Sequence, residues 1–101
     1  MNAAVLYGNE DIRYTKWPDP RPGCVKIRVK ACGICGSDIP RVLKHGAHFY
    51  PIVLGHEFSG IVEEIAEDVT NLSVGDHVAG VPLIPCMKCD DCIRGNYSQC
   101  K

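Results

Sequence analysis

Four cysteines lie close together near the end of the 101-residue sequence, in the stretch PCMKCDDCIRGNYSQC, residues 85–100. Their spacing is C-x2-C-x2-C-x7-C, and the residues are Cys86, Cys89, Cys92 and Cys100. Closely spaced thiolates bind Zn²⁺ tetrahedrally, and four of them leave no open position for water. The surrounding residues are too polar to form an apolar core, so the metal would order them. The spacing therefore predicts a structural zinc site in a lobe over residues 85–101.

An iron–sulfur cluster is the main alternative for these four thiolates. Three cysteines separated by two residues each are typical of a ferredoxin motif, but that motif ends in C-x3-C-P. Here seven residues separate Cys92 from Cys100, and lysine follows the last cysteine. The long gap favours zinc.

Two shorter stretches upstream carry a different set of ligand types. CGICGSD contains Cys35, and LGHEFSG contains His56 beside Glu57. A thiolate, a neutral imidazole and a carboxylate from separate segments form a mixed site, which can leave one position open for water or substrate. Each signal alone is weak, because single histidines and small buried cysteines more often have structural roles. Together with the four-cysteine lobe they favour a catalytic zinc site.

The elements that must position these groups are mostly β-strands. Runs rich in Val, Ile and Tyr, separated by turn-forming residues, predict strands over residues 3–8, 11–17, 24–32, 58–66 and 76–82. Val25, Ile27 and Val29 alternate with basic residues, which predicts a strand with one buried and one solvated face. Several short strands with almost no helix indicate a small, partly open β-barrel.

One short helix is expected between the two upstream stretches. Residues 36–46 favour one or two helical turns, with Pro40 in the first turn and Gly46 at the end. No predicted strand leads into a G-x-G-x-x-G turn, so the dinucleotide-binding fingerprint is absent from these 101 residues.

The composition excludes several classes of protein. Hydrophobic residues make up 46% and charged residues 23%, as in a soluble domain or part of a larger chain. The net charge of −1 offers no field for nucleic acid or an anionic membrane. The apolar runs are too short to span a bilayer, and no signal peptide is present. We therefore expect a cytoplasmic protein with a modest core, in which seven cysteines favour metal binding over disulfides.

Several motifs, in order, resemble one enzyme family. KACGICGSD, LGHEFSG, NLSVGDHV and the spacing of the four-cysteine lobe are similar to the zinc-dependent medium-chain alcohol dehydrogenases. The resemblance runs from Val25 to Cys100 and implies the N-terminal, GroES-like catalytic domain. CGSDIPR and GAHFYPIVLGHEFSG are most similar to the polyol branch, which includes galactitol-1-phosphate 5-dehydrogenases and sorbitol dehydrogenase-type enzymes. The expected fold is mainly β, a GroES-like partly open barrel with a zinc-binding lobe.

The resemblance assigns metal-binding roles to the upstream group. Cys35 and His56 would ligate a catalytic zinc, and Glu57 would be a neighbouring carboxylate that enters or leaves its coordination shell. Of the two cysteines in CGIC, the second holds the ligand position of the family, so Cys32 is not expected to bind metal.

Two more residues would take part in catalysis. Ser37 would hydrogen-bond the substrate alcohol and begin a proton relay. Asp38 would orient His56, as carboxylates commonly do for metal-bound imidazoles. The family chemistry then lowers the pKa of the alcohol through zinc and passes a hydride to a nicotinamide.

The sequence departs from the family pattern at the next relay position. Many members carry a histidine five residues after the zinc-binding cysteine, where this sequence has Pro40. The proton must therefore leave by another route, such as water. His45 and His48 are alternative carriers of this proton in place of the missing relay histidine. Both are, however, better explained as solvated loop residues.

The resemblance implies that residues 1–101 are an incomplete catalytic domain, without the Rossmann domain and the remaining catalytic-zinc ligand. The whole enzyme is expected to oxidise a secondary alcohol of a polyol or polyol phosphate, such as galactitol 1-phosphate, to a ketone with NAD. It would bind one catalytic and one structural zinc, form a homo-oligomer (dimer or tetramer) and have no nucleic-acid or membrane partner. The isolated 101 residues are expected to be inactive.

Two other classes of protein remain as alternatives. A non-catalytic zinc-binding interaction module would need only the lobe, and would bind one zinc. A GroES-type co-chaperonin would share the barrel without any use for Cys35, His56 and Glu57, and would bind none. The number of zinc ions bound therefore separates the three hypotheses.

Overall fold

The computed structural model of the chain describes residues 1–21 and 23–101. Strands predominate, which confirms the predicted mainly β class. The strands are β1 (Asn2–Gly8), β2 (Asp11–Lys16), β3 (Val25–Gly33), β4 (Ile52–Val53), β5 (Glu57–Ile65) and β6 (His77–Ala79). The helices are α1 (Asp38–Leu43), α2 (Asp90–Ile93) and the 3₁₀ turn η1 (Tyr97–Gln99). Within the described residues, no helix has the length and apolar character needed to cross a membrane.

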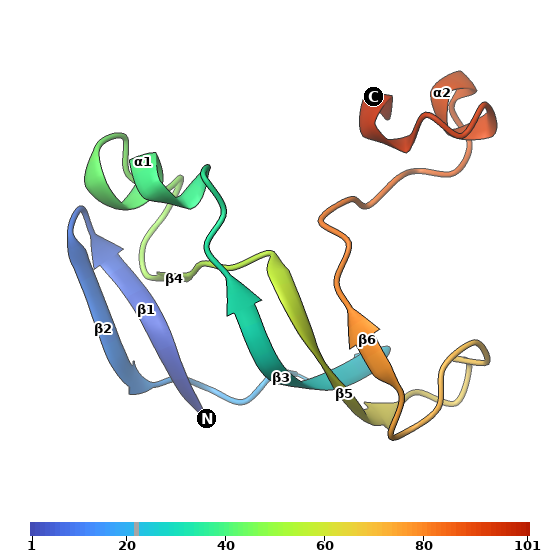
Figure 1. Ribbon diagram of the computed structural model, residues 1–101, viewed down its shortest axis with the longest axis horizontal. Helices are drawn as coiled ribbons and strands as arrows, with labels where there is room; N and C mark the ends of the chain where they lie inside the picture. Colours follow the sequence, from blue (N-terminus) through green and yellow to red (C-terminus); the bar gives the residue numbers. More distant parts are fainter. Residues whose placement is uncertain (22) are drawn as a thin grey trace.

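The strands form two antiparallel sheets of three strands each, in the orders β2-β1-β4 and β3-β5-β6. Figure 1 shows the two sheets side by side, with α1 above the first sheet and the C-terminal lobe apart from both. No ladder joins the sheets within residues 1–21 and 23–101. A groove of about 690 Å³ between them is lined by Ala4 and Val53 on one side and by Ile27 and Phe58 on the other. The arrangement is that of an open barrel.

The core is small, as the chain length predicts. Val5 and Leu6 of β1 and Val62 of β5 are fully buried. Val25 and Ile27 are half-buried, but Val29 is 54% exposed, so the predicted apolar face of β3 is incomplete. The ladder between β3 and β5 shifts register on both sides of residues 27–29. Such bulges interrupt the alternation of faces on which the prediction relied.

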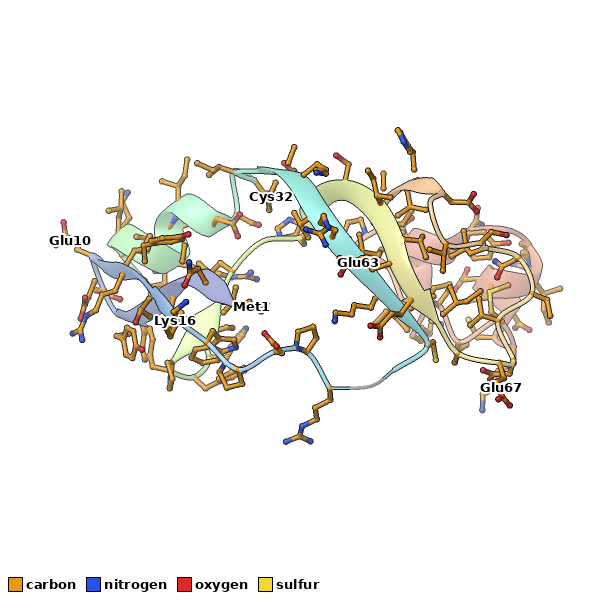
Figure 2. All side chains as sticks on the ribbon, turned by 90° about the horizontal axis from the view of Figure 1, so that it is seen from below. Met1, Glu10, Lys16, Cys32, Glu63 and Glu67 are labelled. Carbon is orange, nitrogen blue, oxygen red and sulfur yellow. The ribbon has the colours of Figure 1, made fainter. Side chains whose placement is uncertain are left out.

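Ion pairs across the ladder reinforce the register of β3 and β5. Lys26 lies opposite Glu64, and their charged groups are 3.6 Å apart. Arg28 donates to Glu63, which Figure 2 labels beside the strand. Cross-strand pairs of opposite charge stabilise a sheet modestly. These ion pairs hold together the end of the ladder near Lys26, whereas the pairing of Gly33 with Glu57 lies beyond both register shifts.

The helix α1 ends at Leu43, three residues before the predicted Gly46. The amide groups of Lys44 and His45 both donate to the carbonyl of Pro40, at 2.9 and 2.7 Å, which closes the last turn. Gly46 instead takes the left-handed conformation in the following loop, with φ of 76°. The helix itself is one to two turns long, as expected.

The turn between β1 and β2 anchors the loop after α1. The side-chain amide of Asn9 donates to the carbonyl of Lys44 at 3.1 Å, and the amide of Glu10 donates to that of Val42 at 2.8 Å. The Tyr50 hydroxyl accepts from the amide of Ala47 at 3.0 Å and donates to Asn9 Oδ1 at 3.1 Å. These hydrogen bonds therefore hold α1 and its following loop, which come after Cys35 in the sequence, against the first sheet.

Replacing Tyr50 with Phe tests this anchor. The change removes one hydroxyl with two partners, so we expect the free energy of unfolding to fall by about 1–2 kcal/mol in urea denaturation. Tyr14→Phe is the matched control, because Tyr14 is 78% exposed on β2. Equal stability of the two variants would contradict the anchoring role.

Candidate metal centres

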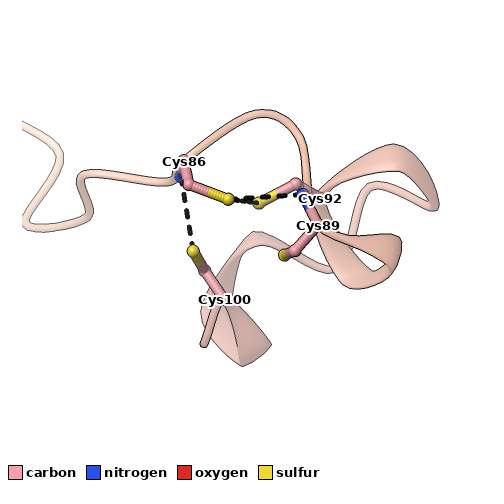
Figure 3. A group of neighbouring side chains, drawn as sticks. All are labelled: Cys86, Cys89, Cys92 and Cys100. Atoms are coloured by element: carbon pink, nitrogen blue, oxygen red, sulfur yellow. Dashed lines mark hydrogen bonds between the residues drawn. The ribbon is translucent and has the colours of Figure 1, made fainter.

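The structure brings the four lobe cysteines together. Their sulfur atoms lie within 4.8 Å of one another, and Figure 3 shows the side chains of Cys86, Cys89, Cys92 and Cys100 around a common space. Short elements position them: Cys89 directly precedes α2, Cys92 lies within α2, and Cys100 directly follows η1. Neither helical segment was predicted from the sequence. Their shortness and polarity leave no periodic pattern from which to predict them.

Backbone groups in the lobe already point at the sulfur atoms. The amide of Cys89 donates to Cys86 Sγ at 3.3 Å, and the amide of Cys86 donates to Cys100 Sγ at 3.3 Å. The sulfur atoms of Cys86 and Cys92 are 3.9 Å apart. N–H groups directed at sulfur favour thiolates over thiols. Four convergent sulfurs with such donors fit a tetrahedral zinc ion.

The lobe thiols differ strongly in proton affinity. The backbone N–H of Cys92 is the main cause that lowers the pKa of Cys89, to about 6. The backbone N–H of Lys88 is the main cause that lowers the pKa of Cys86. Burial raises the pKa of Cys92 to about 12. A metal must displace the proton of Cys92, so zinc binding releases protons and weakens as the pH falls.

Alkylation of the metal-free chain tests these differences. Only the thiolate reacts, so Cys89 should gain reactivity as the pH rises through about 6, whereas Cys92 should stay unreactive at neutral pH. Brief treatment with iodoacetamide followed by peptide mass spectrometry measures both, with the exposed Cys24 as an internal reference. Equal labelling of Cys89 and Cys92 at neutral pH would contradict this difference in thiol pKa. Added zinc should protect both.

The second group is also assembled in the structure. Ligand atoms of Cys35, His56 and Glu57 lie within 4.8 Å of one another. Cys35 lies in the loop between β3 and α1, His56 directly precedes β5, and Glu57 is its first residue. The pairing of Gly33 with Glu57 at the end of the β3–β5 ladder brings the two segments together. A thiolate, an imidazole and a carboxylate in this arrangement suit zinc, which accepts sulfur, nitrogen and oxygen ligands.

Ser37 and Asp38 lie directly beside this group. The Ser37 hydroxyl donates to Cys35 Sγ at 3.3 Å, and Asp38 Oδ2 accepts from the amide of Cys35 at 3.1 Å. Asp38 is 7% exposed, and its Oδ1 has no hydrogen-bond partner among the described residues. That oxygen lies 3.8 Å from His56 Nδ1, slightly beyond hydrogen-bond distance.

The unpartnered oxygen of Asp38 supports the fit of a metal. A buried carboxylate oxygen without a partner is costly, and a small rotation of the His56 ring would supply an N–H. A histidine held through Nδ1 presents Nε2 to a metal. The geometry therefore suits a zinc ion held by Cys35 and His56, with Asp38 orienting the imidazole.

Other candidate residues lie outside both groups of ligand atoms. Cys24 and Cys32 are exposed thiols, and Cys32 pairs with Phe58 on the face of the ladder opposite Glu57. His45 and His48 are exposed loop residues beyond α1. Sequence reasoning did not single out Gly33, because only the register of β3 against β5 shows that it lies opposite a candidate ligand.

The chain matches known proteins over most of its length. Residues 21–101 match the model of the alcohol dehydrogenase GroES-like domain. Galactitol 1-phosphate 5-dehydrogenase of Escherichia coli (strain K12) is 53% identical over 76 residues, which are 75% of this chain. The crystal structure of galactitol-1-phosphate dehydrogenase from Escherichia coli covers 99% of this chain with a TM-score of 0.90 and 43% identity.

A structure of a cobalt and zinc bound thermostable alcohol dehydrogenase from Pyrobaculum aerophilum also covers 100% of this chain, with a TM-score of 0.85 and 34% identity. The chain spans only part of these proteins. It covers 22% of the length of the curated relative and 30% and 32% of the two solved chains.

Proposed function

The chain belongs to the alcohol dehydrogenase GroES-like domain family, and from this premise we propose that it contributes the zinc-binding part of the catalytic domain of a polyol dehydrogenase. The predicted family and GroES-like fold are both confirmed by the comparisons. One observation carries the proposal: Cys35 is 21 residues before the adjacent pair His56 and Glu57 in the sequence, yet the ligand atoms of all three lie within 4.8 Å of one another.

The two groups of ligands have different tasks. The lobe, residues 85–101, holds a structural zinc through four thiolates and keeps no position free for a substrate. The group around Cys35 holds a catalytic zinc with fewer protein ligands, so a substrate oxygen has access. The metal-bound alcohol dehydrogenase from Pyrobaculum aerophilum, at 34% identity, supports a metal in this fold.

When bound, zinc supplies Lewis-acid polarisation of the substrate hydroxyl, and the nicotinamide accepts the hydride. The side chains of this chain perform the remaining tasks. Ser37, whose hydroxyl lies 3.3 Å from Cys35 Sγ, accepts the proton of the substrate alcohol and in the same step passes its own hydroxyl proton onward. Asp38 orients His56. Because Pro40 has no titratable group, the proton then leaves through water.

The substrate is a secondary alcohol of a polyol or polyol phosphate, which becomes a ketone as NAD is reduced. The 53% identity to galactitol 1-phosphate 5-dehydrogenase supports this class. A reducing, cytoplasmic location suits seven free cysteines, of which the four lobe cysteines and Cys35 bind zinc. The whole enzyme forms a dimer or tetramer.

The test is NADH formation by the complete protein with galactitol 1-phosphate, galactitol and ethanol as substrates. The proposal expects the phosphorylated polyol to be the best of the three. Because the 101 residues contain no dinucleotide fingerprint, the chain alone should form no NADH. Activity with ethanol only would contradict the polyol assignment. NADH formation by the 101-residue chain alone would contradict the proposal that this chain contributes only the zinc-binding part of the enzyme.

A change of both outlying cysteines tests the choice of ligands. Cys24 and Cys32 belong to neither group, so a chain carrying Ser at both positions should still bind two zinc ions by native mass spectrometry. Loss of the zinc near Cys35 in this variant would show that Cys24 or Cys32 binds that metal, and would contradict the ligand set proposed here.

A further inference from the structure

The last rungs of the β3–β5 ladder place a glycine directly opposite a proposed ligand. Gly33 pairs with Glu57, and Cys32 pairs with Phe58 one residue before. Residues directly opposite in an antiparallel ladder share a face of the sheet, and neighbours along the strand alternate. Glu57 and the bare α-carbon of Gly33 therefore share one face. The Cys32 side chain, near the end of β3 in Figure 2, is on the other.

The carboxylate of Glu57 lies over Gly33. A β-carbon built on Gly33 would be 2.7 Å from Glu57 Oε2 and 3.3 Å from Glu57 Cβ. A carbon and an oxygen in ordinary contact are farther apart than the first distance, so the carboxylate occupies space that any other residue would fill. In this position an oxygen of Glu57 lies within 4.8 Å of ligand atoms of Cys35 and His56.

We propose that Gly33 is a positioning residue for the metal site: its missing side chain leaves the space in which the Glu57 carboxylate reaches the metal held by Cys35 and His56. This inference rests on the proposed zinc site and adds the determinant of its third protein ligand. Backbone conformation is not the reason for glycine here. The positive-φ glycines of the described chain are Gly46, Gly55, Gly75 and Gly95, so alanine at position 33 is sterically limited by Glu57 and not by its own backbone.

The sequence supplies a matched control in the same segment. A β-carbon built on Gly36 meets nothing within 4 Å, and Gly36 also lies outside the positive-φ set. Gly36→Ala therefore adds the same methyl group to CGICG without touching Glu57. A difference between the two alanine variants reports the contact at position 33 and not a general effect of alanine in this loop.

The experiment measures the affinity of the chain for Zn²⁺ by competition with a chromophoric chelator, starting from chains whose lobe site is already filled. Gly33→Ala should weaken the site near Cys35 by about 10- to 100-fold, as loss of a supporting contact around a metal typically does. Glu57→Gln should weaken it by a similar factor, and Gly36→Ala should leave it unchanged. The double variant Gly33→Ala/Glu57→Gln should be no weaker than Glu57→Gln, because both changes remove the same ligand.

Wild-type affinity in Gly33→Ala, or losses that add in the double variant, would overturn the inference. Cys35→Ser separates this failure from failure of the metal site: unchanged affinity in Cys35→Ser would reject the site itself. Circular dichroism reports whether each variant folds. An unfolded Gly33→Ala chain that folds again as Gly33→Ala/Glu57→Ala would support the steric conflict, whereas two unfolded chains would reject it.

Discussion

Replacing Cys92 with Ser is expected to remove one zinc ion per chain and to release the lobe from its ordered conformation. Cys92 is the buried thiol of the four, and its sulfur lies within 4.8 Å of each of the other three. Structural zinc supplies an apparent ~10–16 kcal/mol in small zinc-finger peptides, and this polar lobe stands apart from both sheets. Amide hydrogen exchange should therefore accelerate across residues 86–100.

The same variant should leave the upstream site intact. Cys35 and His56 are held by the β3–β5 ladder and by α1, which share no ligand with the lobe. Exchange of amides in residues 57–65 should stay as slow as in the wild type. Cys24→Ser is the control for loss of a thiol elsewhere. Unchanged zinc content in Cys92→Ser would show that the lobe assignment is wrong.

Two substitutions in the proposed catalytic site should separate metal binding from proton transfer. His56→Ala removes the neutral ligand and leaves a thiolate and a carboxylate as an incomplete, charge-rich shell, so the complete protein should lose one zinc and its activity together. Ser37→Ala removes only the hydroxyl beside Cys35 Sγ. It should keep both zinc ions and lose roughly 10²–10⁴-fold in turnover, as loss of an acid–base group does.

Zinc content and NADH formation are measured on the same preparations of the complete protein. Ser59→Ala is a suitable control, since Ser59 is an exposed hydroxyl on β5 outside both ligand groups. A Ser37→Ala enzyme with wild-type turnover would remove that hydroxyl from the mechanism. Full zinc content in His56→Ala would remove the histidine from the metal site.

The strands that carry the sites could be predicted because their sequence patterns are local. Five runs of β-branched and aromatic residues correspond to β1, β2, β3, β5 and β6. The two-residue strand β4 was missed, since Ile52 and Val53 are extended only through pairing with Val5 and Leu6. The exposure of Val29 was missed as well, because the bulges of the β3–β5 ladder depend on the partner strand.

The candidate ligands could be predicted from residue type and spacing, but their surroundings could not. Closely spaced cysteines indicate a lobe site without any tertiary information, and the structure gathers their sulfurs. The unpartnered oxygen of Asp38, 3.8 Å from His56 Nδ1, depends on how α1 lies against β5. The space over Gly33 depends on strand register. These features arise only when separate segments meet.

The number of zinc ions bound by the 101-residue chain tests the central claim most directly. Native mass spectrometry of chain refolded with zinc should show two ions in the wild type, one in Cys92→Ser and one in Cys35→Ser, because the two sites share no ligand. One ion in the wild type, unaffected by Cys35→Ser, would contradict the account and indicate a zinc-binding module built on the lobe alone.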